Sequence, residues 1–206
     1  HTNDFTVGNP PPFTYPGAAS TTAYTAGLIV TNGTCSDTIY KNVQLINEKA
    51  DFTIPNAKVC RKQQVTFAST NDTLLVKKYQ WIVDGASAAK DTLRTLDTLF
   101  ATLGAHTLAL MITDNNNCTD LSAGKTINVV GPTAGFTVPN GGGCVKDSVQ
   151  ILDASSSAST TIKKWQYDFK GGTGNNSAQN PKAYYATPGY YLLVQVVYDD
   201  LGCTDT

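Results

Sequence analysis

The chain has 206 residues and a formal net charge of −1, with 15 basic residues against 16 acidic ones. This nearly equal number of basic and acidic residues gives no electrostatic footprint for nucleic acid or an anionic membrane, and neither is expected as a partner. No apolar run approaches the roughly 18 residues of a transmembrane helix, so membrane insertion is not expected. Charged residues make up 15% of the chain, and the abundance of Thr, Asn, Ser and Val is typical of an extracellular β protein.

The first predicted strand precedes Cys35 and recurs twice later in the chain. In each occurrence apolar residues alternate with period two, a polar turn carrying a cysteine follows, and a second strand completes a hairpin, as at residues 43–45 and 127–129. The positions predicted to face inward are Tyr24, Ala26, Leu28 and Val30 in the first occurrence, His106, Leu108, Leu110 and Ile112 in the second, and Tyr191, Leu193, Gln195 and Val197 in the third.

Shorter strands are predicted between these hairpins. They lie at residues 50–53 and 65–67 and around Trp81, and they recur at 134–137 and 149–151 and around Trp165. About seven short strands per copy, with frequent turn signals and no helical period, predict an all-β chain of antiparallel sandwiches.

The recurrence defines an array. A shift of 84 residues carries Phe52 onto Phe136 and Trp81 onto Trp165, and we expect these four aromatic residues in the cores. His106 and Tyr191 occupy the same inward position in their copies, so packing is expected of both. The predicted domains are residues 1–47, the C-terminal part of a truncated domain; 48–131, a full domain; and 132–206, a domain lacking its last strand. Short linkers between them predict a semi-rigid rod.

Cysteine spacing predicts one staple within each full copy. Cys60 and Cys118 lie 58 residues apart, and Cys144 and Cys203 lie 59 apart. We expect these two pairs to be bonded, each stabilising its domain by roughly 4 kcal/mol, and Cys35 to be unpaired because its partner would lie upstream of residue 1. No Cys-x-x-Cys spacing suggests redox chemistry. Paired cysteines favour an extracellular, secreted location.

Residues 189–199, the preceding Asn180-Pro181 and the upstream Trp165 resemble the polycystic kidney disease (PKD) domain, whose pattern runs W-x-F-G-D-G, N-P-x-H-x-Y, G-x-Y-x-V-x-L-x-V-x-D. The first copy retains Asn9-Pro10. Both full copies depart from the pattern at W-x-F-G-D-G. The resemblance implies tandem immunoglobulin-like sandwiches of PKD type. The added cysteines are similar to those of PKD-like arrays in Bacteroidetes cell-surface proteins, notably gliding-motility adhesins exported by type IX secretion.

Catalysis and metal binding have little support. The two histidines are His1 and His106, and no base is placed beside a nucleophilic Ser or Cys, so no enzyme activity and no cofactor are expected. Calcium is the alternative for the turns that carry Asp114, Asp199 and Asp200, although calcium usually takes six to eight oxygen ligands. Solvated turns explain these carboxylates better.

Two further kinds of surface site are possible from the pattern. Tyrosines 184, 185, 190, 191 and 198 could form a carbohydrate platform in the last copy. Asp-Ser/Thr followed by an aliphatic residue resembles the O-glycosylation sequon of Bacteroidetes exported proteins. It marks Thr38, Thr73, Thr92, Thr98 and Ser148.

The leading hypothesis is a non-enzymatic extracellular repeat array that forms a semi-rigid, disulfide-stapled stalk of a large surface adhesin, with a role in gliding motility. Its partners are neighbouring repeats of the same chain and a polysaccharide or protein ligand that the sequence does not identify. The alternatives are an accessory polysaccharide- or protein-binding module of a secreted hydrolase, and linkers rigidified by calcium.

Overall fold

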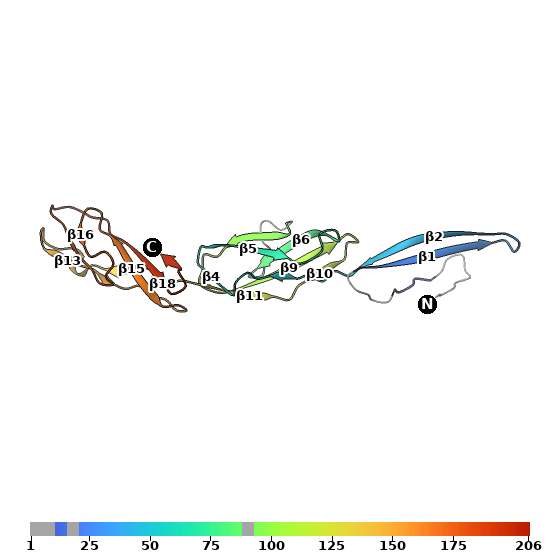
Figure 1. Ribbon diagram of the computed structural model, residues 1–206, viewed down its shortest axis with the longest axis horizontal. Coiled ribbons are helices and arrows are strands. Elements are labelled where there is room, and N and C mark those ends of the chain that lie inside the picture. Colours follow the sequence, from blue (N-terminus) through green and yellow to red (C-terminus); the bar gives the residue numbers. More distant parts are fainter. Residues whose placement is uncertain (1–10, 16–20, 88–92) are drawn as a thin grey trace.

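The protein forms an elongated row of three bodies in a computed structural model, which describes residues 11–15, 21–87 and 93–206. Figure 1 shows a two-stranded hairpin, a central sandwich and a C-terminal sandwich in chain order along the long axis. His1, Asn9-Pro10 and Thr92 lie outside the described residues.

The hairpin pairs β1 (Thr21–Thr31) with β2 (Ser36–Ile46) along their whole length. The Asn32 side chain accepts the amide N–H of Cys35 at 2.9 Å, which closes the tight turn between them. Residues of the hairpin that were predicted to face inward are exposed to solvent. Leu28 and Val30 are 60% and 61% exposed, whereas their counterparts Leu110 and Ile112 are buried. Among the described residues, no second sheet covers these strands as one does in the central sandwich.

The central sandwich packs a three-stranded sheet, β3-β5-β8, against a six-stranded sheet, β4-β11-β9-β6-β7 with β10 on β9. Pairing is antiparallel except between β4 and β11, which run parallel at the end nearest the C-terminal sandwich. The strands are β3 (Phe52–Thr53), β4 (Lys58–Cys60), β5 (Gln64–Ser69), β6 (Val76–Val83), β7 (Ala86–Ser87), β8 (Thr95–Leu99), β9 (Gly104–Asp114), β10 (Thr119–Leu121) and β11 (Lys125–Val130).

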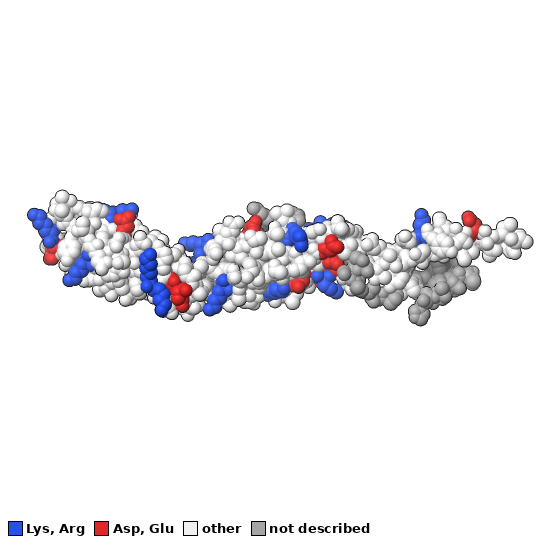
Figure 2. All heavy atoms as spheres, in the orientation of Figure 1, with Lys and Arg blue, Asp and Glu red and all other residues white. Residues whose placement is uncertain are grey.

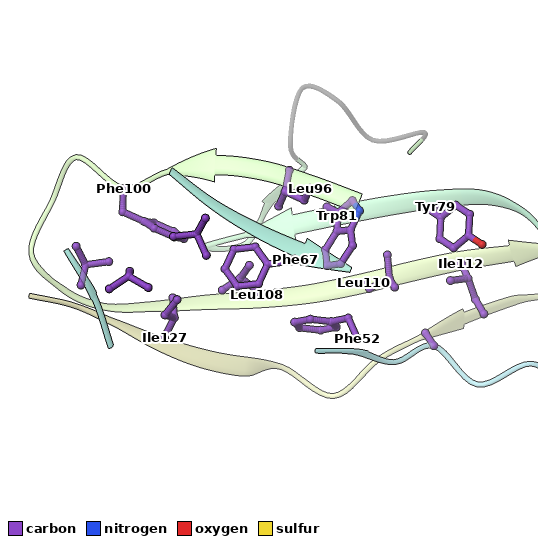
Figure 3. Packing of buried hydrophobic residues seen from close by; sticks show 14 of the residues in the cluster. Phe52, Phe67, Tyr79, Trp81, Leu96, Phe100, Leu108, Leu110, Ile112 and Ile127 are labelled. Carbon is purple, nitrogen blue, oxygen red and sulfur yellow. The ribbon is translucent and has the colours of Figure 1, made fainter. Parts of the chain in front are cut away.

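Its core lies between these two sheets (Figure 3). The Trp81 ring is fully buried, meets Phe52 edge-on with 5.3 Å between ring centroids, and donates its indole N–H to the Leu93 carbonyl at 3.1 Å. Leu108 and Leu110 on β9 are buried with them, as the alternation along that strand predicts. Burial of this size is the main source of stability in such a sandwich.

The C-terminal sandwich repeats part of this arrangement around a smaller core. Its sheets are β12-β14, β13-β17-β16 and β15-β18-β19. The elements are β12 (Phe136–Thr137), the 3-10 turn η1 (Pro139–Gly141), β13 (Ser148–Gln150), β14 (Leu152–Asp153), β15 (Ile162–Asp168), β16 (Thr173–Gly174), β17 (Lys182–Tyr184), β18 (Val194–Asp199) and β19 (Thr204–Asp205).

The strand predicted from residue 189 begins only at Val194. In the central sandwich β11 pairs with Gly104 to Leu108, the first residues of β9, and no described residue plays the part of β11 here. Phe136, Trp165 and Tyr191 are consequently half-buried, where their central counterparts Phe52, Trp81 and His106 are buried.

Charged side chains are spread along the whole length of the face shown in Figure 2, with neither sign gathered into one patch. No helix among the described residues is long and apolar enough to cross a membrane.

His106 is a buried hydrogen-bonded residue of the central sandwich. Its Nδ1 lies 2.6 Å from the Asp84 carboxylate, and its Nε2 lies 3.1 Å from the Thr102 carbonyl oxygen. Burial opposes protonation, but the hydrogen bonds to Asp84 and Thr102 outweigh it and raise the pKa of His106 above its usual value. The same contact lowers the pKa of Asp84.

This pair predicts a pH-dependent stability. Because the folded pKa of His106 is raised, the stability that the His106–Asp84 pair contributes is fully present below pH 6.5. It is lost as the pH rises through the folded pKa. We expect the free energy of unfolding to fall between pH 6 and pH 8, by less than about 1 kcal/mol because Asp84 is half-exposed. His106→Gln should flatten that fall in calorimetric scans, and an unchanged slope would contradict the assignment.

Candidate functional site: the junction between the two sandwiches

A disulfide joins the central sandwich to the C-terminal sandwich. It links Cys60, at the end of β4, to Cys203, in the turn between β18 and β19, with 5.3 Å between the Cα atoms. The two cysteines are 143 residues apart in the sequence. The bond thus closes a loop that contains most of both sandwiches.

The predicted pairs Cys60–Cys118 and Cys144–Cys203 are wrong. Cys118 follows the end of β9, an 11-residue strand, whereas Cys60 pairs with Val130 on β11, next to the residue that pairs with the first residue of β9. At about 3.4 Å per residue, β9 holds these two cysteines roughly 35 Å apart, so no disulfide can join them. Cys118 and Cys144 are free and exposed, as is Cys35, for which no partner was expected.

Arg61 ties the same two bodies together beside the disulfide. Its guanidinium lies 2.9 Å from the Asp205 carboxylate and donates to the Pro132 carbonyl oxygen at 2.8 Å. The side chains of Arg61 and Asp205 are only 17% and 14% exposed, so the ion pair is screened less than a surface pair.

The linker is buried between these contacts. Val130, Gly131 and Pro132 are all buried, and the Val130 carbonyl accepts the Arg61 amide N–H at 2.9 Å. Gly131 has a φ of 146°, and a Cβ there would lie 3.6 Å from the Cys203 Cβ. A positive φ beside a packed disulfide favours glycine at this position.

Asp205 also fixes the start of the C-terminal sandwich. Its second carboxylate oxygen accepts the Ala134 amide N–H at 2.9 Å, while Thr133 pairs with Ser156 through two backbone hydrogen bonds. One carboxylate therefore bonds to the linker strand and to the preceding sandwich at once. A disulfide, an ion pair and a buried linker together hold one orientation.

The junction between hairpin and central sandwich repeats part of this arrangement. Asp120 accepts the Ala50 amide N–H at 2.8 Å, as Asp205 does for Ala134, and that bond and Lys49 lower the Asp120 pKa. Lys49 lies 3.0 Å from Asp120 but is 72% exposed. No disulfide crosses this junction within the described residues.

The calcium candidates serve as turn caps. One oxygen of Asp114 accepts the amides of Asn116 and Cys118, one oxygen of Asp199 accepts those of Leu201 and Cys203, and Asp200 accepts that of Thr161. No cluster of three or more potential metal ligands occurs in the part of the chain that the structure describes.

The remaining candidates lie apart from the junction. Tyr185 and Tyr191 stack on each other with centroids 4.0 Å apart, and Tyr184 and Tyr190 are exposed. Of the possible glycosylation residues, Thr38 and Thr73 are exposed, and Thr98 and Ser148 are half-buried.

The junction is the site that the sequence did not predict. Its signals were present as Arg61 directly after Cys60, Asp205 shortly after Cys203, and an apolar linker. They could be combined only by considering contacts between copies as well as within one.

Mainly antiparallel sheets pack around an apolar core in the central sandwich and again in the C-terminal one. The chain is an array of immunoglobulin-like β-sandwich modules. No protein-family model matches the sequence, and a search of curated proteins finds no match.

Several solved structures are similar to the chain at low identity. Fibronectin(III)-like modules of CbhA from Clostridium thermocellum share 18% identity with a TM-score of 0.37, covering 76% of this chain and 89% of that one. The Bacteroides ovatus glucan-utilisation protein SGBP-B, solved with a heptasaccharide, shares 12% with a TM-score of 0.33, covering 78% and 46%. The fibronectin-III array of RIM-binding protein shares 12% with a TM-score of 0.32, covering 77% and 60%.

Proposed function

We propose that the chain is a segment of a semi-rigid extracellular stalk, built from PKD-like modules, that belongs to a large surface adhesin of the gliding-motility type exported by type IX secretion. It acts mechanically and performs no catalysis. The modules are residues 1–47, 48–131 and 132–206, and the linkers between them hold each module in a fixed orientation relative to the next.

The observation that carries this proposal is the disulfide between Cys60 and Cys203. A protein that only needed stable modules would staple each one internally, whereas this bond spans a junction and restrains bending as well as unfolding. Arg61 and the buried Gly131-Pro132 linker remove the remaining freedom at the same place. A disulfide of this kind persists in oxidising surroundings, which supports a location outside the cell.

Small-angle scattering in solution tests the stalk. The oxidised chain should scatter as one elongated particle with a narrow distribution of maximum dimension. A Cys60→Ser/Cys203→Ser chain should show a broader distribution, because the linker then pivots about Gly131 with only Arg61 to restrain it.

A Cys118→Ser/Cys144→Ser chain is the matched control, since it removes two exposed thiols and keeps the junction. Identical distributions for the junction variant and this control would refute a role of the disulfide in stiffness.

A further inference from the structure

We propose that Cys118 and Cys144 are each half of a disulfide of the Cys60–Cys203 kind. In this arrangement Cys144 bonds to the Cys203-type cysteine of a module that follows, and Cys118 bonds to the Cys60-type cysteine of a module that precedes. The disulfides then interleave, so that every module is bonded to both of its neighbours. This inference concerns connectivity and holds whether or not the array is part of an adhesin.

Cys60 and Cys144 stand in the same turn. In both, the cysteine carbonyl oxygen accepts the amide N–H three residues later at 3.1 Å. The residue two positions after the cysteine has a positive φ, 62° at Lys62 and 67° at Lys146. That residue donates its amide N–H to the carbonyl oxygen of an equivalent aromatic residue, Phe100 at 2.8 Å or Tyr185 at 3.0 Å.

Cys118 and Cys203 also share one turn. The Cys118 amide donates to Asp114 Oδ1 at 2.9 Å, and the Cys203 amide donates to Asp199 Oδ1 at 2.7 Å. The reverse bonds, from each Asp amide to the cysteine carbonyl, are 2.9 and 3.0 Å. The Cys118 backbone therefore makes the same turn hydrogen bonds as the backbone of Cys203, which is in a disulfide.

The observed bond shows what these positions do when a neighbour is present. Cys60 lies at the C-terminal end of its sandwich, and Cys203 lies in the turn at the N-terminal end of the next one (Figure 1). Cys144 and Cys118 occupy those same two ends, and both are exposed. In the proposed arrangement a neighbouring module brings the partner to each of them, as the C-terminal sandwich brings Cys203 to Cys60.

In the proposed arrangement the disulfide recurs at every junction, whereas the ion pair between Arg61 and Asp205 does not. Val145 stands at the position of Arg61, so Asp205-type carboxylates lose their arginine partner at the next junction. The hydrogen bond from Ala134 to Asp205 has its counterpart between Ala50 and Asp120. The backbone connection and the cysteines are thus the common elements of each junction.

Formation of each bond is a two-electron oxidation. Two thiols lose two protons and two electrons as the S–S bond forms, and a disulfide oxidant takes them up. With oxidised glutathione, its S–S bond breaks and two molecules of reduced glutathione are released.

The test adds one module to the chain. A second copy of residues 122–206 is appended after Thr206, because Leu121 and Thr206 are equivalent positions. The added residues 122–131 supply the counterpart of β11, and the rest supplies a following module. The shallow groove lined by Phe136 and Leu193 is the place where that strand should pair.

The extended chain is refolded with glutathione and its disulfides are mapped by mass spectrometry. We expect two bonds, Cys60 to the first Cys203 and the first Cys144 to the appended Cys203, with the appended Cys144 left as a thiol. Cys144→Ser in the extended chain should return the appended Cys203 to a thiol and leave the Cys60 bond intact.

A bond between Cys144 and Cys203 of the same module, or an appended Cys203 that stays reduced while the Cys60 bond forms, would overturn the proposal. The unextended chain provides a second check that does not require a new module to fold. In it Cys118 and Cys144 should both remain alkylatable after oxidation, and any bond between them would count equally against the proposal. Failure of this map leaves the scattering result untouched, since that depends on Cys60–Cys203 alone.

Discussion

Pulled from its two ends, the oxidised chain should release only a small fraction of its contour length. Tension entering through the N-terminus reaches Cys60, crosses the disulfide to Cys203 and leaves at Thr206. The chain between the two cysteines, which are 143 positions apart in the sequence, is bypassed, so most of both sandwiches is shielded. Of the two sandwiches, residues 48–59 and 204–206 lie outside the loop. They are fewer than about 20 residues, so drawing them out adds less than roughly 70 Å at 3.3–3.6 Å per residue.

Reduction should add about 500 Å, because 143 residues at about 3.5 Å each become extensible from cysteines whose Cα atoms start 5.3 Å apart. Single-molecule force spectroscopy with and without reductant measures this difference directly. Cys60→Ser/Cys203→Ser should behave like the reduced chain in both conditions, and Cys118→Ser/Cys144→Ser should keep the full redox dependence. Equal released lengths before and after reduction would show that the bond is not in the path of the force.

The sheets could be predicted because their signals are local. Alternation along β9 identified the buried Leu108, Leu110 and Ile112, and the repeat placed Trp81 and Phe52, which are both buried. Period-two burial and turn residues act within a few positions of each other, so a single copy carries all the information needed.

The cysteine pairing could not be predicted by the same means. An interval of 58 residues between Cys60 and Cys118 matches one copy, but it says nothing of which end of a sandwich each residue occupies. That is decided by the direction of β9, which carries the chain from one end to the other before Cys118. Repetition made the wrong pairing and the right one equally regular, since both place one bond in each period.

Removing the disulfide should also lower the thermal stability of the C-terminal sandwich strongly. While the central sandwich stays folded, the linker at Pro132 and the bond at Cys203 anchor both ends of a loop of roughly 70 residues. In the chain-entropy relation, closing such a loop disfavours its unfolded state by about 4 kcal/mol. For a module of this size each kcal/mol shifts the melting temperature by about 4–8 °C, so a decrease of at least about 15 °C is expected.

The decrease should be uneven, and calorimetry of the oxidised protein and of Cys60→Ser/Cys203→Ser resolves it. Oxidised, the C-terminal sandwich should melt together with the central one, because the closed loop disfavours its unfolded state and raises its melting temperature toward that of the larger sandwich. Once the bond is removed, the C-terminal sandwich should melt first, since its core of Ile151, Tyr167, Phe169 and Ala183 is far smaller than that of the central sandwich.

Arg61→Ala with the disulfide intact is the comparison that separates the covalent contribution from the polar one. It removes the contacts to Asp205 and Pro132, which together are worth about 2 kcal/mol, and leaves the loop closed. Its melting transition should therefore stay single and fall less than that of the cysteine variant. A larger fall for Arg61→Ala would mean that the ion pair, rather than the bond at Cys60, couples the two sandwiches.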